Sequence, residues 1–158
     1  MFYEVKRTRQ ALTKQRCIEI LTEEKRGVLS VQGEDGYPYA MPMNHYYDPA
    51  THRLYFHGGK VGYKIDCLKN NPKCSYVAFR PCGMDDNGWA KIFESVIIFG
   101  RVSFLADEKE IVSYARKLCD KFTQDESYVE HELQTSLKGT AMFYIEIEHM
   151  TGKTVHEK

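Results

Sequence analysis

The sequence lacks an excess of either basic or acidic residues, a long apolar run and an N-terminus like that of a signal peptide. Its 158 residues include 22 basic and 22 acidic side chains, and this balance gives no reason to expect a polyanionic partner such as nucleic acid. No apolar run approaches the roughly 20 residues that a helix needs to cross a bilayer. Residues 1–10 have no apolar core of the kind found in signal peptides. We therefore expect a cytoplasmic protein without a membrane partner.

Closely paired cysteines are also missing. The chain has five cysteines, an odd number, and none of them form a C-x-x-C pair. A zinc site built from Cys67, Cys74, Cys82 and a histidine is conceivable, but structural zinc sites usually pair ligands about two to four residues apart. We expect no metal site, and instead reduced thiols that pack as small apolar residues, at Cys17, Cys67, Cys74, Cys82 and Cys119.

Aromatic residues are plentiful, at 13% of the chain with eleven tyrosines, and hydrophobic residues make up 42%. A chain of this length and composition is long enough for one substantial core. We therefore expect a single globular domain over residues 1–158, with its core at roughly 13–153, and strands that favour aromatic residues.

The hydrophobic pattern predicts more strands than helices. Helices are expected over 13–26 (with Thr13 as the N-cap), 61–69, 107–122 and 126–137, and an irregular loop over 81–88. Strands are expected over 28–32, 43–47, 54–57, 74–79, 90–105 (with a bulge or bend at Gly100) and 141–147. Strands that follow one another as hairpins indicate a mainly β protein, an antiparallel barrel of six or seven strands with flanking helices. A doubly wound parallel sheet fits poorly.

The segment 57–66 carries the most distinctive chemistry. Gly58 and Gly59 allow backbone amides to approach an anion, and the predicted helix that follows adds a partial positive charge at its N-terminus. Lys60 and Lys64, four residues apart, are expected on one face of that helix. This combination suits the phosphate of a bound nucleotide, although two lysines on a solvated helix face are the alternative interpretation.

Five segments in order resemble a known family. Residues 42–44, 54–58, 62–66, 91–102 and 145–153 are similar to the nitroimidazole-resistance (Nim) family, which belongs to the pyridoxamine-5′-phosphate-oxidase-like, flavin-binding split barrels. The resemblance spans roughly residues 28–153. Each segment is short, and the specificity comes from finding all five in the same order.

The resemblance implies a homodimer of split β-barrels that binds two FMN molecules at the subunit interface; some relatives carry FAD instead. The flavin ring would lie along the strand with Met41, Pro42, Met43 and Asn44, and the phosphate would lie against His57, Gly58, Gly59, Lys60 and Lys64. Ser95 and Val96 would complete the pocket, and Trp89 of the other subunit would cover it.

The chain departs from the family at one point. Many split-barrel oxidases have an arginine on the strand that leads into the flavin site, and residues 39–46 contain none. Phosphate contacts would therefore depend on lysines and backbone amides, which are less directional than a bidentate guanidinium. This argues against pyridoxamine-phosphate oxidation itself, because that substrate brings a second phosphate.

Three of the implied site residues each have a second interpretation. His57 is the best candidate to contact substrate, as a hydrogen-bond donor or proton relay near neutral pH, but a lone histidine is more often structural. Asn44 either holds the pyrimidine edge of the flavin or ends a strand. Ser95 either faces the flavin or bonds a neighbouring carbonyl.

Two classes of function follow from the resemblance. The first is a flavin-dependent oxidoreductase that reduces a small aromatic or heteroaromatic molecule, such as a nitroimidazole, with the cofactor transferring the electrons. The second is a flavin-binding or sensing module without turnover. Haem binding in the same barrel, with His57 as an axial ligand, is a weaker third alternative because no second ligand is evident.

Overall fold

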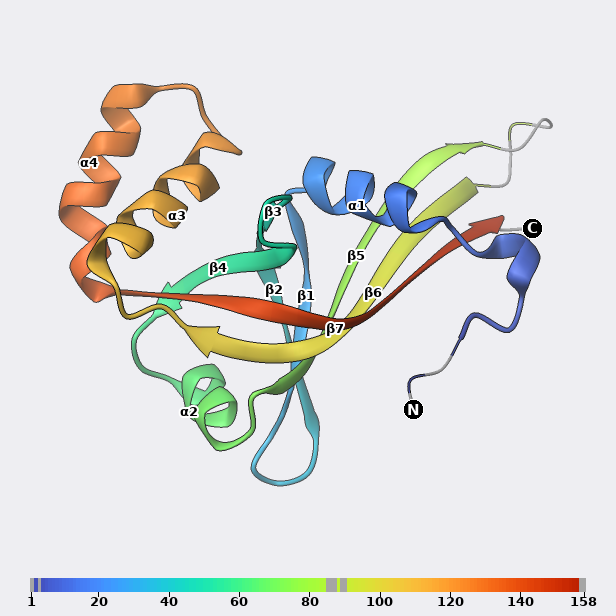
Figure 1. Ribbon diagram of the computed structural model, residues 1–158, viewed down its shortest axis with the longest axis horizontal. Helices are drawn as coiled ribbons and strands as arrows, with labels where there is room; N and C mark the ends of the chain where they lie inside the picture. The colour runs from blue at the N-terminus through green and yellow to red at the C-terminus, as the bar shows by residue number, and fades with distance from the viewer. Residues whose placement is uncertain (1, 3, 85–87, 89–90, 157–158) are drawn as a thin grey trace.

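The computed structural model describes residues 2, 4–84, 88 and 91–156, and its centre is one curved antiparallel sheet (Figure 1). Seven strands lie in the order β2-β1-β5-β6-β7-β4-β3. Their bounds are β1 (Arg26–Gln32), β2 (Pro38–Asn44), β3 (Tyr46–Asp48), β4 (Arg53–Gly59), β5 (Lys73–Met84), β6 (Lys91–Phe104) and β7 (Thr140–His156). All the strand pairs are antiparallel, so the predicted mainly β class with an open, split barrel is confirmed.

The helices begin where the sequence places capping residues. The Thr13 side chain accepts a hydrogen bond from the Arg16 amide at 3.1 Å, and the Asp107 side chain accepts one from the Glu110 amide at 2.9 Å. The bounds are α1 (Lys14–Glu23), α2 (Tyr63–Asn70), α3 (Glu108–Asp120) and α4 (Glu126–Ser136), with short 3-10 turns η1 (Thr8–Gln10) and η2 (Leu137–Gly139). The four predicted helices are confirmed, with α1 shorter than expected.

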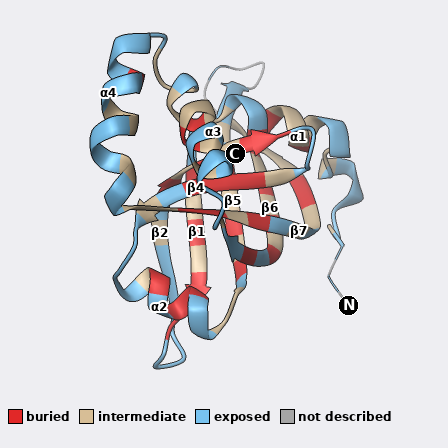
Figure 2. Ribbon diagram, turned by 60° about the vertical axis from the view of Figure 1, so that its left-hand side comes forward, coloured by how far each residue is buried: buried red, intermediate tan, exposed pale blue. Residues whose placement is uncertain are grey.

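Helices α1 and α2 lie at opposite ends of the sheet, while α3 and α4 form a hairpin beside β4 (Figure 1). The buried faces of α1 and α2 join the inner face of the sheet in one core, shown red in Figure 2. Ile20, Leu29, Phe56 and Ile98 are completely buried there. This core fixes the strands that carry the candidate site residues.

The chain crosses from one edge of the sheet to the other at His45. The predicted strand 43–47 is wrong, because it is two strands: β2 pairs with β1, and β3 pairs with β4 at the opposite edge. His45 lies between them and is completely buried. Its Nε2 atom lies 2.8 Å from the Leu21 carbonyl oxygen and its Nδ1 atom lies 2.7 Å from the Tyr76 hydroxyl. These bonds fix the crossover that leaves the barrel split.

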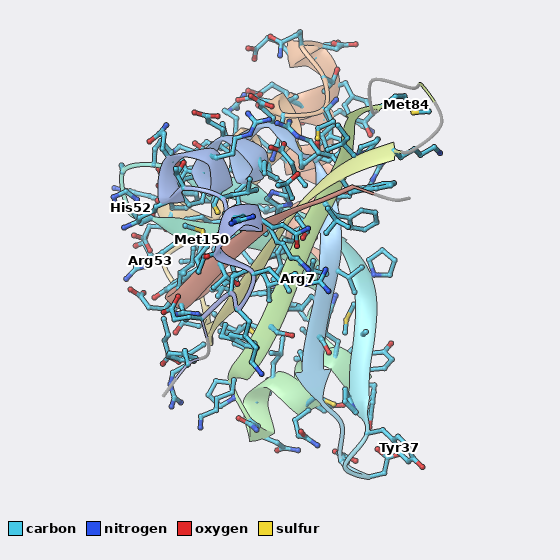
Figure 3. All side chains as sticks on the ribbon, turned by 90° about the vertical axis from the view of Figure 1, so that its right-hand side faces the viewer. Arg7, Tyr37, His52, Arg53, Met84 and Met150 are labelled. Carbon is cyan, nitrogen blue, oxygen red and sulfur yellow. The ribbon has the colours of Figure 1, made fainter. Side chains whose placement is uncertain are left out.

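Strands β5 and β7 are longer than the sequence pattern predicts, whereas β6 agrees with the predicted strand to within one residue at each end. The predicted loop 81–88 is wrong over its first half, because β5 continues to Met84 after a register shift between Pro81 and Gly83. A second shift between Phe99 and Gly100 confirms the predicted irregularity in β6. Tyr37, at the tip of the β1–β2 hairpin, and Met84 mark opposite ends of the molecule (Figure 3).

In the part of the chain that the structure describes, no helix is long and apolar enough to cross a membrane. The five cysteines are free thiols, of which Cys17, Cys67 and Cys74 are buried. The expectation that the thiols pack as small apolar residues is confirmed for these three and is wrong for Cys82, which is exposed.

Candidate functional site

The candidate site lies in the split between β2 and β4. β2 is an edge strand that pairs with β1, and β4 pairs with β3 only through residues 53–55. The remaining edge of β4, residues 56–59, therefore has no strand partner on that side within the described sheet, although β2 and β4 contact each other. Two strand edges with free backbone donors and acceptors thus lie close together, an arrangement that can hold a polar planar group.

Lys64 extends into this split from the first turn of α2. Its Nζ atom lies 3.4 Å from the Sδ atom of Met43 on β2 and 5.9 Å from the ring centroid of Phe143 on β7. The side chain is partly buried, and desolvation lowers its pKa. Among the ion pairs of the described residues, none involves Lys64. A desolvated ammonium whose partners are a thioether and an aromatic ring has the charge and the N–H donors to bind an anion.

Glycines give the Lys64 ammonium its position. A Cβ atom at Gly58 would lie 2.9 Å from Lys64 Nζ, so only glycine leaves the ammonium this close to the β4 backbone. Gly62 precedes α2 with φ 120°, a conformation that L side chains rarely adopt, and no side chain caps this helix end. The Ile65 and Asp66 amides both donate to the Gly62 carbonyl oxygen, which leaves the amides of Tyr63 and Lys64 for an anion at this helix end.

Lys60 does not share a helix face with Lys64, so that prediction is wrong. α2 begins at Tyr63, and Lys60 lies in the connection after β4. Lys60 is exposed and lines a pocket together with Lys69 and Phe104. The local reason is Gly62, whose positive φ starts the helix two residues later than the sequence pattern indicates.

His57 and Asn44 line a common chamber of about 320 Å³ beside the split. Its floor comes from β4, β7 and the end of β2, and its roof comes from α3, α4 and η2. Asn44 Oδ1 accepts a hydrogen bond from Arg26 Nε at 3.0 Å, which orients the amide. The two side chains that the sequence singled out as substrate and flavin contacts are therefore neighbours of one cavity.

The environment of His57 favours the neutral imidazole. Desolvation lowers the pKa of His57, the charge of Lys64 lowers it further, and the carboxylate of Glu132 raises it by a smaller effect. The His57 side chain is nevertheless exposed, because the chamber that it lines is open to solvent. At neutral pH such a ring can both donate and accept a hydrogen bond.

The remaining predicted residues fall on two faces of the sheet. Met43 and Val96 are buried and belong to the core, and Met41 packs against that core. Pro42 is exposed on the outer face, where its register partner is Val28. Gly59 ends β4 opposite Thr140.

Ser95 does not meet Lys64 or His57 within one chain. It lines a different pocket, with Arg7 and Lys153, and its hydroxyl donates to the Lys153 carbonyl oxygen at 3.4 Å. Trp89 lies outside the described residues.

Two contributors to the site went unnoticed in the sequence. Arg26 orients Asn44 from the neighbouring strand, and Glu132 faces the chamber from α4. Strand register could have indicated Arg26, but nothing local marks Glu132, because a glutamate on an amphipathic helix is typical of a solvated face.

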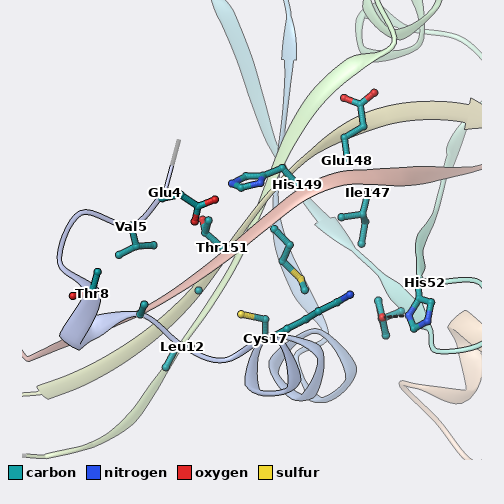
Figure 4. A pocket seen from close by; sticks show the side chains of 15 residues that line it. Glu4, Val5, Thr8, Leu12, Cys17, His52, Ile147, Glu148, His149 and Thr151 are labelled. Atoms are coloured by element: carbon teal, nitrogen blue, oxygen red, sulfur yellow. Dashed lines mark hydrogen bonds between the residues drawn. The ribbon is translucent and has the colours of Figure 1, made fainter. Parts of the chain in front are cut away.

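A second concavity, of about 680 Å³, lies between the N-terminal segment, α1 and β7. Figure 4 shows Glu4, Cys17 and His149 lining it from these three elements. None of the site residues predicted from the sequence lines it. We therefore place the candidate site at the split and the smaller chamber.

Comparison with known proteins identifies the family of the chain and its fold. The sequence model of a family described as pyridoxamine 5′-phosphate oxidase matches residues 13–154. No curated protein matches the chain.

Several solved structures share the fold. A candidate 5-nitroimidazole antibiotic resistance protein from Bacteroides thetaiotaomicron is 23% identical with a TM-score of 0.79, and the match covers 93% of this chain and 87% of that one. An FAD-binding protein from Mesorhizobium loti is 24% identical with a TM-score of 0.66, covering 92% and 97%. A flavocytochrome from Azotobacter vinelandii is 20% identical with a TM-score of 0.78, covering 96% and 72%. At these identities the similarity establishes the fold.

Proposed function

The chain belongs to the pyridoxamine 5′-phosphate oxidase family, and from this premise we propose that it binds FMN in the split between β2 and β4 and uses it to reduce a small aromatic or heteroaromatic molecule. A nitroimidazole is the substrate type that the resemblance to the Nim family suggests. The names of two neighbours, an FAD-binding protein and a flavocytochrome, support a flavin as the ligand.

The observation that carries this proposal is the Lys64 ammonium. It is partly buried at the split, and its described contacts are Met43 and Phe143. Together with the uncapped start of α2, it offers an anion one full charge and free backbone amides. The residues present therefore fit a flavin phosphate, and the space that Gly58 leaves beside Lys64 belongs to the same cradle.

The flavin ring would lie along the edge of β2. The backbone groups of Met41, Pro42 and Met43 that β1 leaves unpaired, and the oriented amide of Asn44, would supply donors and acceptors for its pyrimidine edge. When bound, the flavin supplies the electron transfer, and the chain supplies orientation and a partly dry pocket. His57, which lines the same chamber as Asn44, would donate a hydrogen bond to a bound substrate or hold a proton at its ring nitrogen.

We further propose that the protein is a homodimer that pairs through the outer face of the sheet. A cross-strand row of partly covered, mainly apolar side chains lies on this face, from Pro42 through Val28 and Val77 to Ile97. Ser95 lies on the same face of β6 as Ile97, so a partner subunit could bring its Ser95 towards the flavin. Sedimentation should show a dimer, and Ile97→Asp should shift it to the monomer.

The phosphate assignment is tested by flavin titration of two lysine variants of α2. Lys64→Ala should bind FMN about 10- to 100-fold more weakly, the loss expected for one charge-assisted contact. Lys69→Ala removes an exposed lysine from the same helix and should bind FMN like the wild type. Equal affinity of both variants for FMN would contradict the assignment.

The reaction is tested by reducing the bound flavin with dithionite and adding a nitroimidazole without oxygen. Reoxidation of the flavin supports the reductase. A flavin that stays reduced with each nitro compound supports instead the alternative of a binding or sensing module.

A further inference from the structure

The chamber beside the split is large enough for a small aromatic molecule. Its volume of about 320 Å³ exceeds the roughly 150 Å³ of an engineered protein cavity that holds benzene. Its walls are mainly apolar and come from α3, η2, α4 and β7, through Ala115, Leu118, Phe122, Leu133, Leu137 and Met142. Such walls favour a flat apolar body over a sugar or a flexible polar chain.

One lining residue carries a formal charge at neutral pH. Among the described residues that line the chamber, Glu132 is the acidic side chain and no lysine or arginine is present, while desolvation lowers the pKa of His57 and favours its neutral form. The groups that face His57 are Lys64 from α2, which lowers its pKa, and Glu132 from α4, which raises it. The chamber itself is therefore negative, although the neighbouring split is positive.

The carboxylate of Glu132 accepts a hydrogen bond from the next turn of α4. The Ser136 hydroxyl donates to Glu132 Oε2 at 3.1 Å, and the Thr140 hydroxyl donates to the Ser136 carbonyl oxygen at 2.8 Å. All three residues line the chamber. An acceptor that a neighbouring hydroxyl orients in this way can select ligands by charge and by N–H donors.

We propose that this chamber binds the small aromatic substrate of the flavin site. Glu132 determines which substrates are accepted by their charge: uncharged or cationic molecules bind, and anions are excluded. The proposal rests on the proposed function and adds a substrate class and a specificity-determining residue to it. A ligand with an N–H group directed at Glu132, and its ring between the apolar walls, would reach His57 and Asn44 at the mouth of the split.

The test uses three molecules of nearly the same shape that differ in charge: benzamidine, benzamide and benzoate. Their affinities are measured by NMR titration of the purified wild-type protein, with the ring signals of His57 as a reporter of the chamber. The wild type should bind benzamidine and benzamide at least tenfold more tightly than benzoate, because a fixed carboxylate repels an anion in a partly desolvated pocket. Binding of benzoate as tight as that of benzamide would overturn the proposal.

Two variants separate Glu132 from a general effect of charge. Glu132→Gln should reduce the preference for benzamide over benzoate by about tenfold. Glu130→Gln removes the same charge from the same helix, where Glu130 is exposed and paired with Arg116, and should leave the preference unchanged. Ser136→Ala frees the carboxylate and should reduce the preference by a smaller factor. An equal effect of the Glu130 and Glu132 variants would refute the role of Glu132.

Flavin binding is measured on the same samples, so that the two proposals fail separately. Loss of FMN uptake in a protein that still selects benzamide refutes the flavin site and leaves the chamber standing. Uptake of FMN in a protein whose His57 signals respond to none of the three molecules refutes the chamber and leaves the flavin site standing.

Discussion

His45 makes the fold sensitive to mild acid. The imidazole is completely buried at the crossover between β2 and β3. Because the Leu21 carbonyl can only accept, Nε2 carries the proton and Nδ1 accepts a hydrogen bond from the Tyr76 hydroxyl. The Lys121 ammonium donates to the carbonyl oxygens of Leu21, Glu24 and His45, so a positive charge already lies next to the ring. Burial and then this charge lower the pKa of His45 to about 3.

The sign and size of the effect follow from proton linkage. The folded pKa of His45 lies below its ordinary value of 6.5, so the unfolded chain binds the extra proton. The corresponding stability is fully present above pH 6.5 and is lost progressively as the pH falls towards 3. Between pH 7 and pH 5 the expected loss from this group is about 2 kcal/mol. Burial lowers the pKa of Lys121 from 10.5 to about 8, so the unfolded chain holds this proton more tightly and the cost of burying the charge is relieved as the pH rises above about 8.

Urea denaturation of the wild type and of His45→Gln at pH 7, 6 and 5 measures this loss. Other groups, such as the carboxylates, titrate in both proteins, so the difference between the two pH dependences isolates His45. The wild type should lose about 2 kcal/mol more than the variant over this range. Parallel pH dependences, or a His45 NMR signal that titrates between pH 5 and 7 in the folded protein, would refute the reasoning.

Three further predictions concern packing and thiols. Gly27→Ala should lower the free energy of unfolding by about 3 kcal/mol or more, measured with urea, because its Cβ would lie 2.3 Å from the Val77 carbonyl oxygen. Tyr114→Phe should cost about 1–3 kcal/mol in the same assay, because its hydroxyl donates to the Asp48 carboxylate at 2.8 Å. In the folded protein Cys82 should react with a thiol reagent first, since it is exposed. The buried thiols of Cys17, Cys67 and Cys74 should react only after unfolding. Early reaction of these three would contradict the structure.

Local signals were sufficient for most of the fold. Capping residues located α1 and α3 because a cap satisfies backbone donors that belong to a particular helix start, as Thr13 and Asp107 do. Gly100 marked the irregularity in β6 because a Cβ there would lie 2.2 Å from the Glu146 carbonyl oxygen on β7.

Contacts between residues distant in the chain could not be predicted from the sequence. Residues 43–47 form a continuous strand pattern, and the break at His45 arises from partners that are distant in the chain, Leu21, Tyr76 and Lys121. The same limit applies to the site. The sequence identified Lys64 and His57, but only the structure separates Lys60 from Lys64 and places Glu132 beside His57.

An absorbance spectrum of the purified protein after incubation with FMN, with mass spectrometry of the released ligand, tests the central claim most directly. The account predicts flavin absorbance that stays with the protein through gel filtration, a released mass equal to FMN, and loss of both in Lys64→Ala with retention in Lys69→Ala. A folded, colourless protein that takes up neither FMN nor FAD would contradict the flavin site.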